Sequence, residues 1–225
     1  MKNYALFLAG RYYERDFPFY RKLARGRVRF FRKLARGRVR VAVDGGYRYF
    51  ARSGTFPHLL IGDLDSLGGI PSNLSPRTQV LVHPVEKDQT DTELALDHCL
   101  DAGTRDIDII QPAIGDPDHF LANLFLLARK ARPSRSRPTQ LRLVGPHFEA
   151  FYLKNNTHRF ERATGSTVSV IPLSTLIKLS WTGTAYNVRE ACVKRGQTRS
   201  TRNRIISGRA SVRVVGESFL IRLTG

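Results

Sequence analysis

Residues 78–113 read TQVLVHPVEKDQTDTELALDHCLDAGTRDIDIIQPA, and this stretch holds the pattern of a strand, a helix and a second strand. The runs at 78–84 and 106–113 are short and apolar, as buried strands are. Between them, Thr90 and Glu93 have the spacing of a capping box, and Gly103 is placed to end the helix that Thr90 begins. Two strands joined through a helix are typical of a parallel sheet.

The same alternation continues on both sides of this unit. The pattern predicts further strands at 4–10, 39–46, 58–66 and 140–145, and further helices at 17–26, 47–54 and 118–131. Strands that alternate with helices predict an α/β class, here a Rossmann-like domain of three layers at residues 1–145 with a mostly parallel sheet covered on both faces.

The pattern changes after Gly145. From there to the end, short strand-like runs such as STVSVIPL, ASVRVV and SFLIRL are separated by Gly, Asn and Thr. Many short strands without intervening helices favour an antiparallel β-sandwich at residues 146–225.

The charge of the chain is strongly basic but unevenly placed. The formal net charge is +18 and the isoelectric point is about 10.7, which favours anionic partners. Residues 19–29 (FYRKLARGRVR) and 30–40 (FFRKLARGRVR) form a tandem repeat that holds ten Lys and Arg and no acid. We interpret the repeat as a solvated basic segment, and binding of a polyanion such as nucleic acid is the alternative.

Cysteine content and hydropathy give the expected compartment. The two cysteines, Cys99 and Cys192, are too few for a disulfide framework and match no zinc pattern, so we expect reduced thiols. The N-terminal residues lack the pattern of a signal peptide, and no apolar stretch approaches the roughly 20 residues that span a bilayer. The sequence therefore predicts a cytoplasmic protein with no membrane partner.

Acidic side chains follow three of the predicted strands in succession. Asp44 opens DGG, Asp63 and Asp65 lie in GDLDS, and Asp88 and Asp91 lie in KDQTD. Ligands bind an open parallel sheet at the carboxyl ends of its strands, and carboxylates that converge there repel one another unless a cation lies between them. Mg²⁺ suits such a site and would also bind a polyphosphate. Taken singly, each residue also fits a turn or a helix start.

A further segment could contribute to the site, whereas four other acids are predicted to be surface charges. Asp118 and His119 begin a predicted helix in GDPDHFLANL (115–124), where a helix N-terminus favours anions; a cap for Asp118 and an exposed position for His119 are the alternatives. We interpret four other acids as surface charges: Asp97, Asp101, Asp106 and Asp108.

Together, these segments resemble the thiamine pyrophosphokinase family. VDGG (43–46), GDLDS (62–66), KDQTDTELAL (87–96) and GDPDHFLANL appear in the order of the family pattern, and TGSTVSVIPL, WTGTAYNV and STRNRIISG resemble its β-domain. The resemblance implies transfer of pyrophosphate from ATP to thiamine with Mg²⁺, giving thiamine pyrophosphate and AMP. It also implies a homodimer with the active site between its subunits.

The resemblance also implies roles for individual residues. The metal ligands would be Asp63, Asp65 and Asp91, and Asp88 would join them in catalysis; the choice of base between Asp88 and Asp91 stays open. ATP and its phosphates would contact Asp44, Gly45, Ser66, Lys87, Thr90 and Asp118, with an exposed lysine as the alternative for Lys87. Thiamine would contact His119, Tyr186, Ser200 and Asn203, where an aromatic ring suits a planar cation.

The chain departs from the family pattern at a few positions. Asp116 stands where the family has Arg, Ile114 replaces a Gly, and Arg202 interrupts the S-x-S-N segment. Asp116 reverses a charge beside the phosphates, and we expect Arg48 or an arginine of the basic loops to replace it. Two alternatives remain: a pyrophosphokinase acting on another alcohol such as a hydroxymethylpterin, and a nucleic-acid-binding protein that uses the repeat.

Overall fold

The computed structural model describes residues 3–24, 38–104, 106–113, 115–131 and 140–223. Residues 25–37 of the repeat, Ile114 and the basic loop at 132–139 lie outside the described residues. The chain divides into two compact units, one of residues 1–126 with 130–146 and the other of residues 127–129 with 147–225. A helix that is long and apolar enough to cross a membrane does not occur in the described part of the chain.

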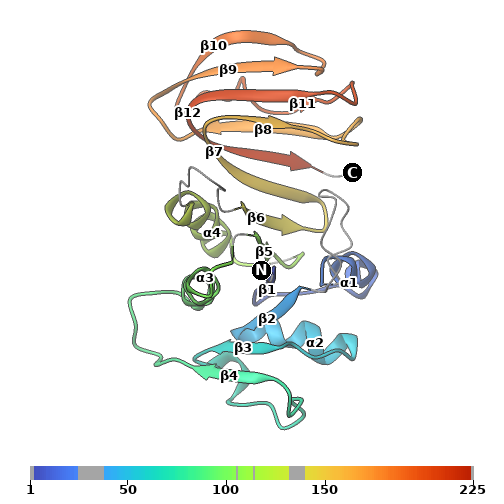
Figure 1. The fold of residues 1–225 in the computed structure, drawn as a ribbon, viewed down its shortest axis with the longest axis vertical. Coiled ribbons are helices and arrows are strands. Elements are labelled where there is room, and N and C mark those ends of the chain that lie inside the picture. The colour runs from blue at the N-terminus through green and yellow to red at the C-terminus, as the bar shows by residue number, and fades with distance from the viewer. Residues whose placement is uncertain (1–2, 25–37, 105, 114, 132–139, 224–225) are drawn as a thin grey trace. The chain divides into compact units, whose positions relative to one another are not determined.

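The first unit contains a six-stranded parallel sheet in the order β6-β5-β1-β2-β3-β4 (Figure 1). The strands are β1 (Tyr4–Phe7), β2 (Val39–Val43), β3 (Leu59–Gly62), β4 (Gln79–Val82), β5 (Asp106–Ile110) and β6 (Gln140–Gly145). The helices are α1 (Phe17–Ala24), α2 (Tyr47–Ser53), α3 (Asp91–Asp101) and α4 (Pro117–Lys130), with short 3-10 turns η1 (Glu14–Asp16), η2 (Asp44–Gly46) and η3 (Asp65–Leu67). The predicted alternation of strands and helices and the parallel sheet are confirmed.

Aromatic side chains fill much of the core of this unit. The rings of Phe7 and Tyr49 stack with centroids 4.7 Å apart, and Tyr20 of α1 meets Tyr12 and Tyr49 edge-on. Aromatic pairs of this geometry stabilise a core beyond the area that they bury. Helices α1 and α2 are thereby held against the sheet.

The structure describes the start of the first repeat copy and the end of the second. Helix α1 contains Phe19–Ala24 of the first copy, whereas in the second copy Arg38 precedes β2 and Val39 and Arg40 begin it. Deletion of residues 25–35 joins Ala24 to Arg36, and the remaining chain again reads FYRKLARGRVR before VAVDGG.

We therefore expect the deletion of residues 25–35 to leave the protein folded. The shortened chain keeps the residues of α1 and β2 and leaves residues 36–38 between Ala24 and Val39. This connection is within the usual length between a helix and a strand, so the free energy of unfolding should stay within about 1 kcal/mol of the full chain. Urea unfolding followed by circular dichroism measures this. A chain that no longer folds would show that both copies are needed.

A group of ion pairs lies inside the first unit, around Asp108 of β5. Asp108 is 1% exposed and lies 2.8 Å from Nη1 of Arg38, while Arg142 of the neighbouring β6 donates two hydrogen bonds of 2.7 Å to it. Arg38 also lies 3.4 Å from Asp106. The prediction that Asp108 is a surface charge is wrong, because two arginines distant in sequence offset its charge within the fold.

The second unit is built from antiparallel strands (Figure 1). They are β7 (Phe148–Arg159), β8 (Thr167–Pro172), β9 (Leu176–Thr182), β10 (Val188–Lys194), β11 (Asn203–Arg204) and β12 (Ser211–Leu223). The runs ASVRVV and SFLIRL belong to one strand, β12, whose pairing with β7 shifts at a bulge between Val214 and Glu217. Gly216 within the bulge has a φ of 109° and its amide donates to Asn155. The predicted antiparallel strands are confirmed, with two of the expected strands joined into one.

Candidate active site

Three carboxylates converge where β2 and β3 end. Asp44 follows β2, and Asp63 and Asp65 follow the neighbouring strand β3; one oxygen of each lies within 4.8 Å of the others. The Oδ1 atom of Asp44 is buried and accepts no hydrogen bond from any described residue. We name Asp44, Asp63 and Asp65 the acidic cluster.

The glycines of the DGG turn let the chain pass close to its neighbours. A Cβ on Gly46 would lie 1.9 Å from the carbonyl oxygen of Phe7, so no larger residue fits there without displacing backbone. A Cβ on Gly45 would lie 2.9 Å from Oγ of Ser66, which places these two predicted phosphate-binding residues side by side. Asp44 itself has a φ of 44°, a conformation that L-residues rarely adopt.

Lys87 connects the acidic cluster to the start of α3. Its Nζ atom lies 2.6 Å from Asp63 and 3.2 Å from Asp91, and it donates to the carbonyl of Pro84 at 2.9 Å. The hydrogen bond from Lys87 lowers the pKa of Asp63, whereas burial raises the pKa of Asp91, and Asp63 and Asp44 nearby raise it further. Burial lowers the pKa of Lys87, but its bonds to Asp63 and Asp91 outweigh burial and leave that pKa raised. Lys87 is therefore an ion-pair partner of two predicted site residues.

The predicted metal set and the observed cluster differ at one position. The predicted set was Asp63, Asp65 and Asp91, but the acid that shares the short separations with Asp63 and Asp65 is Asp44. Asp91 begins α3 next to its N-cap Thr90, whose hydroxyl accepts from the amide of Glu93. The predicted capping box is confirmed on the side of Thr90.

A second set of polar contacts joins the loop at Lys87–Asp91 to helices α3 and α4. Gln89, which precedes the N-cap of α3, donates to Glu93 at 3.1 Å and to Asp97 at 3.3 Å, two residues that lie four apart on one face of the helix. Lys130 at the end of α4 lies 2.9 Å from the buried Glu93 and 2.8 Å from Asp97. The prediction of Asp97 as a surface charge missed this network, although the i, i+4, i+8 spacing of Gln89, Glu93 and Asp97 was a usable signal.

Replacing Lys130 by Met should lower the free energy of unfolding by about 2 kcal/mol, because Glu93 and Asp97 would lose the cation that both contact. Urea unfolding measures the change. Lys194→Met is the matched control, because Lys194 is exposed and forms no ion pair among the described residues. Equal effects of the two substitutions would contradict a supporting role for Lys130.

Three residues of the first unit that were predicted to belong to the active site are exposed. Asp88, Asp118 and His119 are all exposed, and no hydrogen bond or ion pair joins them to the acidic cluster within the described residues. Asp118 accepts from the amide of His119 at 2.8 Å, inside α4 rather than before it. Arg48 donates to the carbonyl of Ser66 and so lies beside the loop of the cluster, while its role as a replacement charge stays a prediction.

The predicted thiamine contacts in the second unit fall into two kinds. Tyr186 is 76% exposed, but Ser200 and Asn203 are buried at 3% and 6%. Ser200 donates to the carbonyl of Val170 at 2.7 Å. Asn203 accepts from the amide of Tyr186 at 3.1 Å and donates to its carbonyl at 2.8 Å. Asn203 therefore holds the backbone of the residue whose ring is presented to solvent.

Comparison with known proteins assigns both regions of the chain. Residues 31–137 match the family model "Thiamin pyrophosphokinase, catalytic domain", and residues 157–218 match "Thiamin pyrophosphokinase, vitamin B1 binding domain". The chain is 27% identical to thiamine pyrophosphokinase of Bacillus subtilis (strain 168) over 175 residues, which are 76% of this chain and 80% of that one.

Solved structures show the same fold. The crystal structure of thiamine pyrophosphokinase from Bacillus subtilis has a TM-score of 0.77 at 24% identity, with both chains fully covered. The enzyme from Geobacillus thermodenitrificans has a TM-score of 0.74 at 23% identity, covering 98% of this chain and 97% of that one. Thiamin pyrophosphokinase from Candida albicans has a TM-score of 0.70 at 18% identity, covering 100% of this chain and 89% of that one.

Proposed function

The chain belongs to the thiamine pyrophosphokinase family, and we propose that the acidic cluster and the loop at Lys87–Asp91 carry the family reaction. That reaction transfers a pyrophosphoryl group from ATP to thiamine and yields thiamine pyrophosphate and AMP. The convergence of Asp44, Asp63 and Asp65 inside the matched catalytic region carries the proposal. A hydroxymethylpterin acceptor is not favoured, since residues 157–218 match a vitamin B1 binding domain.

The acidic cluster fits a divalent cation. Its three carboxylates offer hard oxygen ligands within 4.8 Å of one another, and Oδ1 of Asp44 is buried without a hydrogen bond from the described residues. Lys87 offsets charge on Asp63 and Asp91, which leaves Asp44 and Asp65 without an ion-pair partner in the part of the chain that is described. We propose that Asp44, Asp63 and Asp65 hold Mg²⁺, which would offset charge on the polyphosphate.

The chain's own residues position the reactants. In the reaction, the thiamine hydroxyl attacks the β-phosphorus of ATP and AMP leaves, so the protein has to orient the two and accept one proton. Lys87 is placed to offset phosphate charge next to Asp63. For the base we favour Asp91 over Asp88, because Asp91 lies outside the cluster yet contacts Lys87, whereas Asp88 is exposed and makes no contact with the cluster among the described residues.

For the acceptor, we propose that Tyr186 contacts the thiamine ring and that Asn203 holds Tyr186 in place. The contacts of Asn203 with both the amide and the carbonyl of Tyr186 support this division of roles. Ser200 is buried and bonded to backbone, so it would support the strand rather than touch thiamine.

Tyr186→Ala should raise the KM for thiamine about tenfold, since stacking and cation–π contacts of one ring contribute about 1 kcal/mol or more. Tyr186→Phe is the matched control, because it keeps the ring and should stay close to the wild-type KM. Steady-state kinetics at saturating ATP measures both. An unchanged KM in Tyr186→Ala would remove Tyr186 from the thiamine site.

We further propose a cytoplasmic homodimer with the active site between its subunits. Cys99 and Cys192 are free, which agrees with a reducing compartment. Light scattering on the purified protein tests the dimer. Mixing Asp63→Asn, which should be inactive, with Tyr186→Ala, which should have a raised KM, tests the shared site at a thiamine concentration well below the wild-type KM. Mixed dimers should then give more activity than either variant alone if each site takes residues from both subunits.

Product analysis tests the proposed function itself. The purified protein is incubated with ATP, Mg²⁺ and thiamine, and AMP and thiamine pyrophosphate are quantified by chromatography. We expect both in equal amounts, and neither when EDTA replaces Mg²⁺. Formation of AMP with a hydroxymethylpterin but not with thiamine would overturn the assignment of the acceptor.

A further inference from the structure

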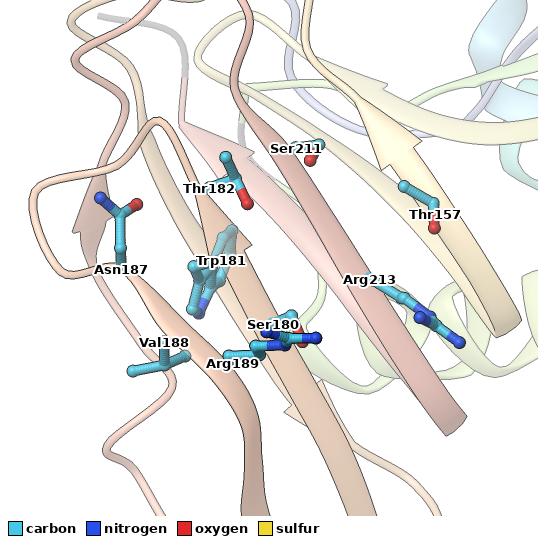
Figure 2. Close-up of a pocket in the computed structure, with 9 residues that line it drawn as sticks. All are labelled: Thr157, Ser180, Trp181, Thr182, Asn187, Val188, Arg189, Ser211 and Arg213. Atoms are coloured by element: carbon cyan, nitrogen blue, oxygen red, sulfur yellow. The ribbon is translucent and has the colours of Figure 1, made fainter.

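A hollow lies on the outer face of the antiparallel sheet in the second unit, with a volume of about 530 Å³ (Figure 2). Strands β7, β9, β10 and β12 contribute to it, together with Asn187 just before β10. Its lining consists of Thr157, Ser180, Trp181, Thr182, Asn187, Val188, Arg189, Ser211 and Arg213.

The pairing of the strands explains why hydroxyls and arginines gather there. Thr157 pairs with Arg213 and Arg213 pairs with Ser180, so these three form a row across β7, β12 and β9. Ser211 and Thr182 pair in the next row on the same face. The residues between them, such as Val212, turn to the opposite face and belong to the buried core.

Arg189 reaches the hollow from a bulge in β10. The pairing with β9 shifts between Val188 and Ala191, and Glu190 within the bulge has a φ of 50°. The amide of Glu190 donates to Oγ of Ser180 at 2.9 Å. Bulges redirect side chains. Here the hydrogen bond to Ser180 connects the bulge to a residue that lines the hollow. The Ser180 oxygen serves as the acceptor, which leaves its hydrogen available to a ligand.

The charge of the hollow has one sign. None of the nine lining residues is acidic, and Arg189 and Arg213 form no ion pair within the described residues. Guanidinium groups donate paired hydrogen bonds that match phosphate oxygens, and hydroxyls add single donors. Two such cations beside four hydroxyl groups present the donors that an oxyanion requires.

We propose that this hollow binds a phosphate or diphosphate group through Arg189, Arg213 and the neighbouring hydroxyls. Unlike the acidic cluster, whose carboxylates repel an anion unless a cation is bound, the hollow attracts anions directly. Binding here therefore needs no metal ion, and that property separates the two sites in experiment.

Isothermal titration calorimetry measures binding directly, because Trp181, the only tryptophan of the chain, belongs to the buried core beside Val212 and is not a direct fluorescence reporter of the hollow. Inorganic pyrophosphate is titrated into the full chain in EDTA, which keeps Mg²⁺ from the acidic cluster. We expect a saturable heat of binding, with a Kd about tenfold higher in Arg213→Gln and in Arg189→Gln, since a hydrogen bond to a charged group contributes this order of affinity. Asp63→Asn should bind as the wild type does.

Arg209→Gln is the matched control, because Arg209 is an exposed arginine of the same unit that does not line the hollow. A Kd raised equally by Arg209→Gln would mean that net charge alone attracts the anion, and it would overturn the site. No saturable heat of binding in EDTA would also overturn it. A change of oligomeric state in Arg213→Gln would also overturn the proposal, because it would show that this face is an interface between copies of the chain. Binding of a DNA oligonucleotide without binding of pyrophosphate would also overturn the proposal, because the ligand of this face would then be a nucleic acid.

Discussion

Asp63→Asn is expected to reduce kcat for pyrophosphoryl transfer about a thousandfold while the protein stays folded. Asp63 belongs to the acidic cluster and also accepts the 2.6 Å bond from Lys87, so its charge serves both the proposed cation and the lysine. Loss of one ligand from a metal site that stabilises transition-state charge raises the barrier by about 4 kcal/mol. The rate of AMP formation at saturating thiamine measures the effect, and its Mg²⁺ dependence should move to higher concentration.

Glu86→Gln is the control for this substitution. Glu86 lies one residue before Lys87, is exposed, and makes no contact with the cluster among the described residues, so its loss removes a charge but not a ligand. We expect near wild-type turnover. If Asp63→Asn kept more than about a tenth of the wild-type rate, an effect under about 1.4 kcal/mol, the acidic cluster would not be the reaction centre.

A basic protein concentrates acids here because the sheet brings the ends of β2 and β3 together. The neighbouring strands run parallel, so loops distant in sequence meet at one edge. Lys87 forms ion pairs with Asp63 of the cluster and with Asp91 outside it, and Lys130 forms ion pairs with Glu93 and Asp97. The uncompensated charge is left on Asp44 and Asp65, where a cation is proposed.

The features of the fold that depend on local sequence patterns were predictable from the sequence. The period of the apolar residues and the turn glycines were enough for the alternation of strands and helices in the first unit, and for Thr90 as the cap of α3. The order of strand ends was enough to place Asp44, Asp63 and Asp65 near one another. These features depend on neighbours in the chain and on the general geometry of parallel sheets.

Contacts between distant segments were not predictable from one sequence. Asp108 lies in an otherwise apolar strand, and its partner Arg38 lies 70 residues away, so nothing local indicates the pair. The burial of Asn203 likewise depends on a turn that it holds from 17 residues away. In β12, a bulge with Gly216 joins two runs that read as separate strands, because the chain shifts its register without ending the strand.

Asp108→Ala is expected to have the largest effect on stability of the substitutions considered, lowering the free energy of unfolding by about 4 kcal/mol. The side chains of Arg38 and Arg142 are only 11% and 16% exposed, and both contact Asp108. Without Asp108, both guanidinium groups would lose the carboxylate that they share in a poorly solvated region. Arg38 would nevertheless keep its contacts with Asp106 and with the carbonyl of Tyr4. Urea unfolding followed by circular dichroism measures the loss.

Two further variants separate this cause from simple loss of side-chain volume. Asp106→Ala removes a carboxylate that is 34% exposed and 3.4 Å from Arg38, so we expect a loss of about 1 kcal/mol or less. The triple exchange Arg38→Met, Asp108→Leu and Arg142→Met removes all three charges together, and apolar residues of similar volume often replace buried ion groups without loss. If unpaired charge is the cause, the triple variant should be more stable than Asp108→Ala, although it carries two more substitutions. A triple variant less stable than Asp108→Ala would show instead that the ion group itself holds β5 and β6 together.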